Sequence, residues 1–227
     1  MFSAMKLLSV LSSAALLVSA APAAPKVCDA SAATMNLPAG QSLIVAPTTG
    51  PKFVALGVGV QNYTCDAATS KYTSVGAVAS LFDISCLVKT PAFANIQTVA
   101  QMAWSLLPPK VSATTIGEKL GAPMLLGYHY FIPNPITGTG LSPKWDFTST
   151  GKFKGDASAF IVAAKAGNIS APKDSAKNVD WLMLNNVQGS LATQVFRVDT
   201  VSGQPPTSCT PGSANISVKY TSKYFLY

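Results

Sequence analysis

The 227-residue chain is 48% hydrophobic and only 11% charged, and its formal net charge is +7. Its positive residues are scattered lysines with Arg197 as the single arginine, whereas nucleic-acid recognition needs clustered Lys and Arg with interleaved aromatic residues. The composition therefore argues against a nucleic-acid-binding protein and leaves weak attraction to an acidic polysaccharide or a cell wall open.

The first twenty residues have the pattern of a secretory signal peptide. Lys6 gives a short basic region, residues 7–18 are apolar, and Val18-Ser19-Ala20 is a cleavage site. We predict cleavage after Ala20, which leaves 227 − 20 = 207 residues and makes the protein secreted and extracellular. No later apolar run is long enough to cross a bilayer, so no transmembrane segment is expected.

The chain beyond the signal peptide divides into an arm and one domain. Residues 21–40 are rich in Ala and Pro and are predicted to form an extended N-terminal arm, and residues 41–227 a single β-rich domain. Residues 41–46 are predicted to form a short first strand, and residues 52–65 form the clearest strand. In the latter, aliphatic side chains alternate with small or aromatic ones: Val54, Leu56, Val58 and Val60 against Phe53, Ala55, Gly57 and Gly59. The aliphatic face suits a core, and the glycines allow another backbone or a large ring to approach closely.

Further elements follow in order. Residues 72–85 continue the strand pattern, and residues 95–107 form the one amphipathic helix expected, with Asn95 as its N-cap. Residues 114–120 add a helical turn. Later strands are predicted over residues 124–132, 144–147, 160–164, 179–187, 191–201 and 215–227. The last of these reads as a half-buried antiparallel strand, with Lys219, Thr221 and Lys223 on its solvent face.

These elements amount to roughly ten strands with no alternating strand–helix rhythm. The fold class is therefore predicted to be all-β and mainly antiparallel, as a single-domain β-sandwich or distorted barrel with one amphipathic helix.

Four cysteines lie beyond the signal peptide, and four cysteines in a secreted chain indicate two disulfides with three alternative pairings. Because two of them close neighbouring strands and two lie near the chain ends, we favour Cys65–Cys209 and Cys28–Cys86. Their spacing fits no zinc site.

Three Asn-X-Ser/Thr sequons begin at Asn62, Asn168 and Asn215, and at least one is expected to be glycosylated. Strict alternation places Asn62 on the same face as Val58 and Val60. Either the strand ends or bulges there, or this sequon is unused.

Standard catalytic motifs are missing from the sequence. The run Gly57-Val58-Gly59-Val60-Gln61-Asn62 has Asn where a dinucleotide fingerprint needs its third glycine, so no cofactor is expected. The single histidine, His129, is the one side chain that titrates near neutrality. Its aspartate partner would be Asp146 or Asp180, with Asp83 and Asp199 as further candidates. The competing interpretation is a structural histidine bonded to backbone.

Several stretches together resemble a known family: Gly57-Val58-Gly59-Val60-Gln61-Asn62-Tyr63-Thr64-Cys65, His129-Tyr130-Phe131, Pro143-Lys144-Trp145, Val179-Asp180-Trp181-Leu182 and Val195-Phe196-Arg197-Val198-Asp199-Thr200. The chain resembles secreted fungal proteins, with bacterial relatives, that are classed as a domain of unknown function. Members are often labelled malate-dehydrogenase-like, but this chain has neither the Rossmann fingerprint nor the alternating α/β pattern of that enzyme. The resemblance supplies no catalytic residues.

Two hypotheses follow. The favoured one is a secreted, disulfide-bonded β-domain that binds an unknown ligand, such as a cell-wall polysaccharide, at a cell surface or cell wall. The alternative is a secreted hydrolytic enzyme that uses His129 with an aspartate.

Arg197 is predicted to be structural, with its planar fork held by a carboxylate or by carbonyls.

Overall fold

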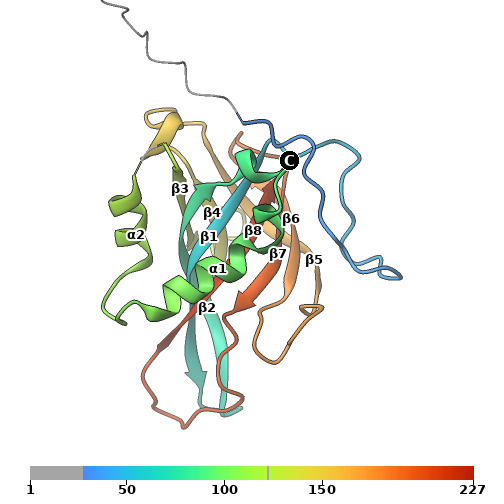
Figure 1. Ribbon diagram of the computed structural model, residues 1–227. Helices are drawn as coiled ribbons and strands as arrows, with labels where there is room; N and C mark the ends of the chain where they lie inside the picture. Colours follow the sequence, from blue (N-terminus) through green and yellow to red (C-terminus); the bar gives the residue numbers. More distant parts are fainter. Residues whose placement is uncertain (1–27, 122) are drawn as a thin grey trace, which may run out of the picture.

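The computed structural model describes residues 28–121 and 123–227 and forms a closed barrel of antiparallel strands (Figure 1). The strands follow one another around the barrel in chain order, and the last pairs with the first. They are β1 (Phe53–Asp66), β2 (Lys71–Asp83), β3 (Leu125–Pro133), β4 (Leu141–Asp146), β5 (Phe160–Ile169), β6 (Trp181–Gln188), β7 (Gln194–Ser202) and β8 (Ile216–Leu226). The predicted all-β, antiparallel class is confirmed as a barrel. The predicted signal peptide, residues 1–20, lies outside the described residues.

Two of the expected elements differ. Residues 41–46 form no strand, because the Gln41 side chain bonds to the backbone of Leu43 and Ile44 and holds a local turn instead. In the described chain the expected amphipathic helix is α1 (Ala92–Leu106), and the helical turn expected over residues 114–120 is a second helix, α2 (Ala113–Leu120). The predicted cap at Asn95 is wrong, because Pro91 occupies the N-cap position and the helix begins three residues earlier.

The two faces of β1 serve different cores. Val54, Leu56 and Val58 point out of the barrel and pack under α1 and the N-terminal segment. Figure 1 shows α1 lying across the outer wall. On the inner face, a Cβ added to Gly57 would lie 2.5 Å from Cε2 of Tyr224. The predicted approach of a large ring to this glycine face is therefore confirmed.

The buried face of helix α1 matches its apolar spacing only in part, since Ile96 and Ala100 pack on the core beside polar side chains. Gln97, Gln101 and Trp104 are buried, while Val99 and Leu106 are exposed. Polar contacts explain this choice, because the Trp104 indole donates to the Gly59 carbonyl at 2.7 Å.

The outer face of β8 lies beneath this helix. Thr221 is fully buried and donates to the Gln97 carbonyl at 2.7 Å. Lys223 is 2% exposed and forms a 2.9 Å ion pair with Asp199. The predicted solvent face of this strand is therefore wrong, since α1 covers it.

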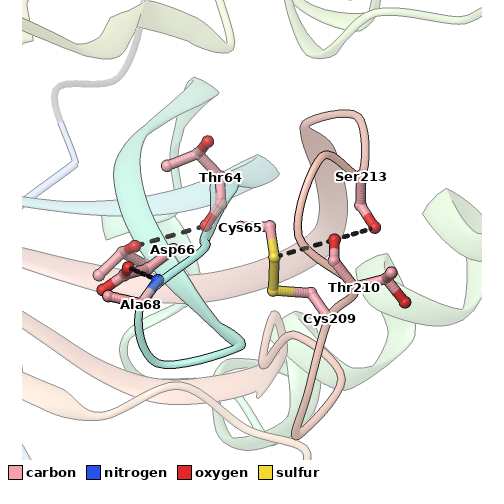
Figure 2. The surroundings of a disulfide bond; sticks show 8 residues. Thr64, Cys65, Asp66, Ala68, Cys209, Thr210 and Ser213 are labelled. Carbon is pink, nitrogen blue, oxygen red and sulfur yellow. Dashed lines mark hydrogen bonds between the residues drawn. A yellow bond between two sulfur atoms is a disulfide. The ribbon is translucent and has the colours of Figure 1, made fainter.

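Both favoured disulfides form. Cys28–Cys86 fastens the N-terminal segment to the short helical turn after β2, and Cys65–Cys209 joins the end of β1 to the β7–β8 connection. Figure 2 shows the second bridge among the turn contacts that flank it, such as Ser213 Oγ donating to the Thr210 carbonyl at 2.6 Å. The two projecting segments are also tied by Cys209 N donating to Ser70 O at 2.9 Å.

The two ends of the barrel differ in how far side chains fill the interior. At the end where β1 begins, here called the closed end, the rings of Phe53, Phe147 and Phe153 pack together at centroid distances of 5.4–6.0 Å. The opposite end, where β1, β3 and β7 finish, is here called the open end. None of the helices in the described parts of the chain has the length and hydropathy needed to cross a bilayer.

Candidate ligand-binding pocket

A pocket of about 570 Å³ lies inside the open end of the barrel. Its apolar wall includes Phe131, Val179, Leu182, Leu184 and Ala163, and its polar lining includes Gln61, Tyr63, Lys165, Asp180 and Arg197. The interior of an eight-stranded barrel is either filled by side chains or left just wide enough for one small ligand. In this barrel, side chains fill one end and a cavity remains at the other. The cavity has the size of an ordinary small-molecule site.

Tyr63 forms one side of this pocket. The register of β1 against β2 shifts between Asn62 and Tyr63, so the predicted irregularity at the Asn62 sequon is a β-bulge. The Tyr63 hydroxyl donates to the Gly203 carbonyl at 2.8 Å, which links β1 to the start of the β7–β8 connection. Burial raises the pKa of Tyr63 to about 12, so its hydroxyl stays protonated and its donor remains committed to Gly203.

Arg197 enters the pocket from β7. Its Nε and Nη2 atoms both donate to the main-chain carbonyl of Asp180, at 3.1 and 3.0 Å. The predicted fork is therefore held by a carbonyl. Within the described chain the guanidinium has no carboxylate within ion-pair distance, and its Nη1 atom has no acceptor. The half-buried Arg197 is thus oriented but not neutralised.

Other interior polar atoms are also unpartnered. Gln61 Nε2, Trp145 Nε1 and Ser222 Oγ are buried and have no hydrogen-bond partner among the residues that the structure describes. Gln61 lies near the Tyr220 hydroxyl, which lies 2.8 Å from the Tyr224 hydroxyl. Buried polar groups are normally satisfied by protein or by water. Of these three side chains only Gln61 lines the pocket, where its amide can bind a polar group of a ligand.

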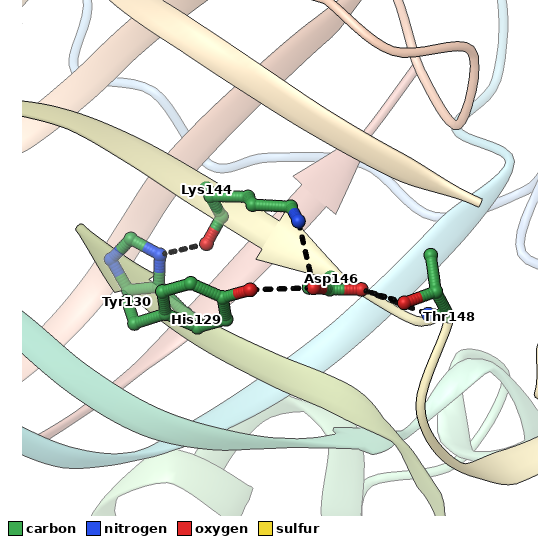
Figure 3. A network of polar contacts seen from close by, with 5 residues as sticks. All are labelled: His129, Tyr130, Lys144, Asp146 and Thr148. Carbon is green, nitrogen blue, oxygen red and sulfur yellow. Dashed lines mark hydrogen bonds and ion pairs between the residues drawn. The ribbon is translucent and has the colours of Figure 1, made fainter. Parts of the chain in front are cut away.

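His129 lies deeper in the barrel. Its ring stacks on Trp145 at a centroid distance of 4.4 Å, and its Nδ1 atom lies 2.9 Å from the Lys144 carbonyl oxygen. Burial lowers the pKa of His129 to about 3, so the ring is neutral at physiological pH. Tyr130, Lys144 and Asp146 alternate with His129 and Trp145 along paired strands and point to the other face (Figure 3).

Asp146 therefore does not approach His129. Its carboxylate accepts from Tyr130 Oη at 2.6 Å, pairs with Lys144 Nζ at 2.8 Å and accepts from Thr148. Burial would raise its pKa, but these contacts outweigh burial and lower the pKa to about 2. Asp146 is therefore ionised at physiological pH and links the polar side chains of an outer-wall network.

The other candidate aspartates are also engaged elsewhere. Asp180 Oδ2 accepts from Asn168 Nδ2 at 3.1 Å, Asp83 lies 3.6 Å from Lys152, and Asp199 pairs with Lys223. The structure brings none of these carboxylates to His129. Over residues 28–121 and 123–227, no three His, Cys, Asp or Glu side chains gather in a way that could hold a metal ion.

A larger hollow of about 1350 Å³ lies outside the barrel, between α1, the loop before β6 and the bulged end of β7. Several of its polar groups bond to one another, including the Lys223–Asp199 pair and the Asn178 side chain with Ser202 N. Gln97 Oε1 is the one buried side-chain atom there without a partner in the described chain. The lining of this groove has three lysines and two aspartates, a net charge of 3 − 2 = +1, so the groove is a second candidate. The barrel pocket is preferred because it holds an oriented arginine with no paired carboxylate in the described chain.

The three sequons differ in exposure. Asn62 Oδ1 accepts from Ser217 Oγ at 2.8 Å, and the Asn168 amide is bonded to Asp180. Asn215 is exposed immediately before β8. Glycosylation stays a prediction, and Asn215 offers the most accessible amide.

The sequence predicts a structural role for Arg197 and no role for Gln61. The missed signal was its position, because Gln61 shares the inner face of β1 with Gly57 and Gly59.

The fold and this pocket define a class, a closed eight-stranded antiparallel barrel with an internal cavity open at one end. A family described as "Protein of unknown function (DUF3455)" matches residues 46–227, and the chain belongs to that family. The expected membership of a domain-of-unknown-function family is confirmed. Neither the curated proteins nor the solved structures contain a significant match to this chain.

Proposed function

We propose that the protein is a secreted binding protein that takes a small molecule into the open end of its barrel. The observation that carries this proposal is the 570 Å³ pocket, lined by an unneutralised arginine and an unpartnered glutamine amide. A buried donor without an acceptor destabilises a protein unless a bound molecule satisfies it. The family resemblance to secreted fungal proteins and the two disulfides support an extracellular location.

The enzyme alternative has less support. His129 is buried against Trp145, and its Nδ1 atom is bonded to a backbone carbonyl. A general base needs a titratable group within hydrogen-bond reach of the proton it removes. No aspartate in the described chain reaches this ring, so the binding interpretation is preferred.

The test is a ligand screen on secreted, disulfide-intact protein, read as the shift in melting temperature. The library contains small organic acids, amides and alcohols, together with soluble fragments of cell-wall polysaccharide. Each hit is repeated on Ser74→Trp, which adds a large ring at the exposed rim of the pocket. The matched control is Ser149→Trp, an exposed turn position at the closed end.

The expected result is that hits stabilise the wild type and Ser149→Trp but not Ser74→Trp. Leu182→Trp, which fills the pocket from its wall, is a second blocking variant. Hits that stabilise both blocked variants as well as the wild type would overturn the pocket as the binding site. A polysaccharide that stabilises both blocked variants would bind to the outer surface of the barrel instead.

A further inference from the structure

The charge of the barrel pocket is unbalanced. Its lining contains two cationic side chains, Lys165 and Arg197, and one carboxylate, Asp180, which gives 2 − 1 = +1. Asp180 does not neutralise Arg197 through its carboxylate, because only its main-chain oxygen contacts the guanidinium. The carboxylate instead accepts from Asn168 Nδ2 at 3.1 Å. A half-enclosed positive site therefore faces the cavity.

The lining of this pocket also carries two free hydrogen-bond donors. Arg197 Nη1 and Gln61 Nε2 lack acceptors among the described residues, and both side chains line the pocket. The arginine comes from β7 and the glutamine from β1, so the two strands bring these donors to one cavity.

The rest of the wall is apolar. Leu182 and Leu184 of β6, Ala163 of β5 and Phe131 of β3 line the pocket around the polar residues. The fork formed by Nε and Nη2 is held by the Asp180 carbonyl, so Arg197 offers a ligand its positive charge and the free Nη1 atom. A charge-assisted hydrogen bond of this kind favours a carboxylate over a neutral acceptor. A phosphate dianion would carry more negative charge than a lining of net +1 compensates, and it has no apolar part to cover the leucines.

We propose that the ligand of this pocket is a small organic carboxylate with an apolar body. Its carboxylate accepts from Arg197 Nη1 and Gln61 Nε2, and its apolar body lies against Leu182, Leu184 and Phe131. This inference rests on the proposed function, because it assigns a ligand class to the same pocket.

The experiment is titration calorimetry on the secreted, disulfide-intact protein at neutral pH. The probes are phenylacetate and hexanoate, their primary amides phenylacetamide and hexanamide, and inorganic phosphate. Each amide keeps the shape of its carboxylate but lacks the charge. The expected result is that both carboxylates bind at least about tenfold more tightly than their amides and than phosphate.

Variants locate the effect. Arg197→Gln is expected to weaken carboxylate binding at least about tenfold while amide affinity changes by less than about threefold. Arg197→Lys keeps the positive charge but loses the planar fork, so its affinity for the carboxylates should lie between those of the wild type and Arg197→Gln. This variant also tests the proposal if Arg197→Gln folds poorly. Gln61→Leu removes the second donor and should weaken carboxylate binding by about threefold or more. The matched charge control is Lys154→Gln, an exposed lysine next to Phe153 at the closed end, which should leave affinity unchanged.

The outcomes separate this inference from the proposed function. Equal binding of carboxylates and amides, abolished by Ser74→Trp, would leave the pocket in place and overturn the carboxylate assignment. Phosphate binding as tightly as the carboxylates would also overturn it. Failure of both carboxylates to bind at about 10 mM would do the same. Carboxylate affinity that is unchanged in both Arg197→Gln and Ser74→Trp would also overturn the assignment of the pocket as the binding site.

Discussion

The closed end of the barrel is filled by aromatic rings, whereas the open end keeps a cavity beside unpartnered polar groups. Phe147 is fully buried and packs edge to face on Phe53 at 5.7 Å. At the open end, Arg197 and Gln61 line about 570 Å³ of space. The same strands run through both ends, so the difference comes from the side chains that alternation directs inward.

This difference separates stability from binding within one barrel wall. At the closed end, the large aromatic rings bury their apolar surface against one another. They also fill the space that a ligand would need. Polar side chains at the open end contribute less to the free energy of unfolding because their hydrogen bonds are incomplete. We therefore expect substitutions at the closed end to act on stability and those at the open end to act on binding.

The largest effect is expected from Phe147→Ala at the closed end. Removing a fully buried ring that contacts Phe53 and Phe153 should lower the free energy of unfolding by about 3–5 kcal/mol. The control is Leu141→Ala, since Leu141 is 50% exposed at the open rim and should cost less than about 1 kcal/mol. Urea denaturation measures both. Equal losses for the two variants would remove the distinction between the ends.

The second prediction concerns His129, which lies between the two ends. Its pKa is about 3 in the folded protein and 6.5 ordinarily, so the unfolded chain binds the proton first as pH falls. The stability that the neutral ring contributes is complete above the ordinary value and is lost progressively toward pH 3. Between about pH 7 and pH 5 the free energy of unfolding should fall by about 2 kcal/mol.

Because the chain has one histidine, a single variant checks this prediction. His129→Phe should show a nearly flat dependence of unfolding free energy on pH over that interval, whatever its absolute stability. A wild-type profile that is also flat would mean that His129 titrates in the folded barrel, which contradicts its burial against Trp145.

The sequence was sufficient for much of the barrel. The alternation in residues 52–65 is strong enough to predict β1 and its glycine face, and the cysteine positions favoured both bridges that form. It was insufficient wherever a side chain is covered by, or bonds to, a distant part of the chain. Lys223 reads as a surface lysine, yet α1 covers it and Asp199 neutralises it. Spacing along the chain carries no information about such a partner.

The same limit applies to the candidate site. Arg197 attracts attention as the single arginine, but its anchor is the main-chain oxygen of Asp180, and a backbone oxygen has no sequence signature. His129 and Asp146 look like partners because they are close in sequence. Strand alternation turns them to opposite faces, because His129 pairs with Trp145 and Asp146 pairs with Tyr128.

A smaller stability effect is expected at Arg197 than at Phe147. Arg197→Ala removes two hydrogen bonds to one carbonyl but leaves no carboxylate unpaired, so the loss should be about 1–2 kcal/mol. A buried ion pair broken at one partner would cost about 3–5 kcal/mol. Thermal and urea unfolding of the ligand-free protein distinguish these values. A loss in the higher range would make Arg197 a structural residue comparable to Phe147.

The smallest effect is expected from Tyr63→Phe, which tests whether the rim of the open end is held by single hydrogen bonds. The variant keeps the ring, which is 6% exposed, and deletes only the hydroxyl that donates to Gly203 O. The free energy of unfolding should fall by about 1 kcal/mol, the net value of one hydrogen bond. The local consequence should be larger than the global one, because this bond joins the bulge in β1 to the β7–β8 connection.

Hydrogen exchange is therefore the sharper measurement for Tyr63→Phe. The amides of Ser202, Gly203 and Gln204 should exchange faster in this variant, while those of β1 near Phe53 should keep their protection. The matched control is Tyr72→Phe, which deletes a hydroxyl from the same β1–β2 hairpin where the described structure gives it no hydrogen bond. If both variants exchange alike, the rim is held by the Cys65–Cys209 bridge and the strand ladder, and the Tyr63 hydroxyl contributes nothing measurable. If only Tyr63→Phe loosens the connection, the open end depends on individual polar contacts where the closed end depends on packing.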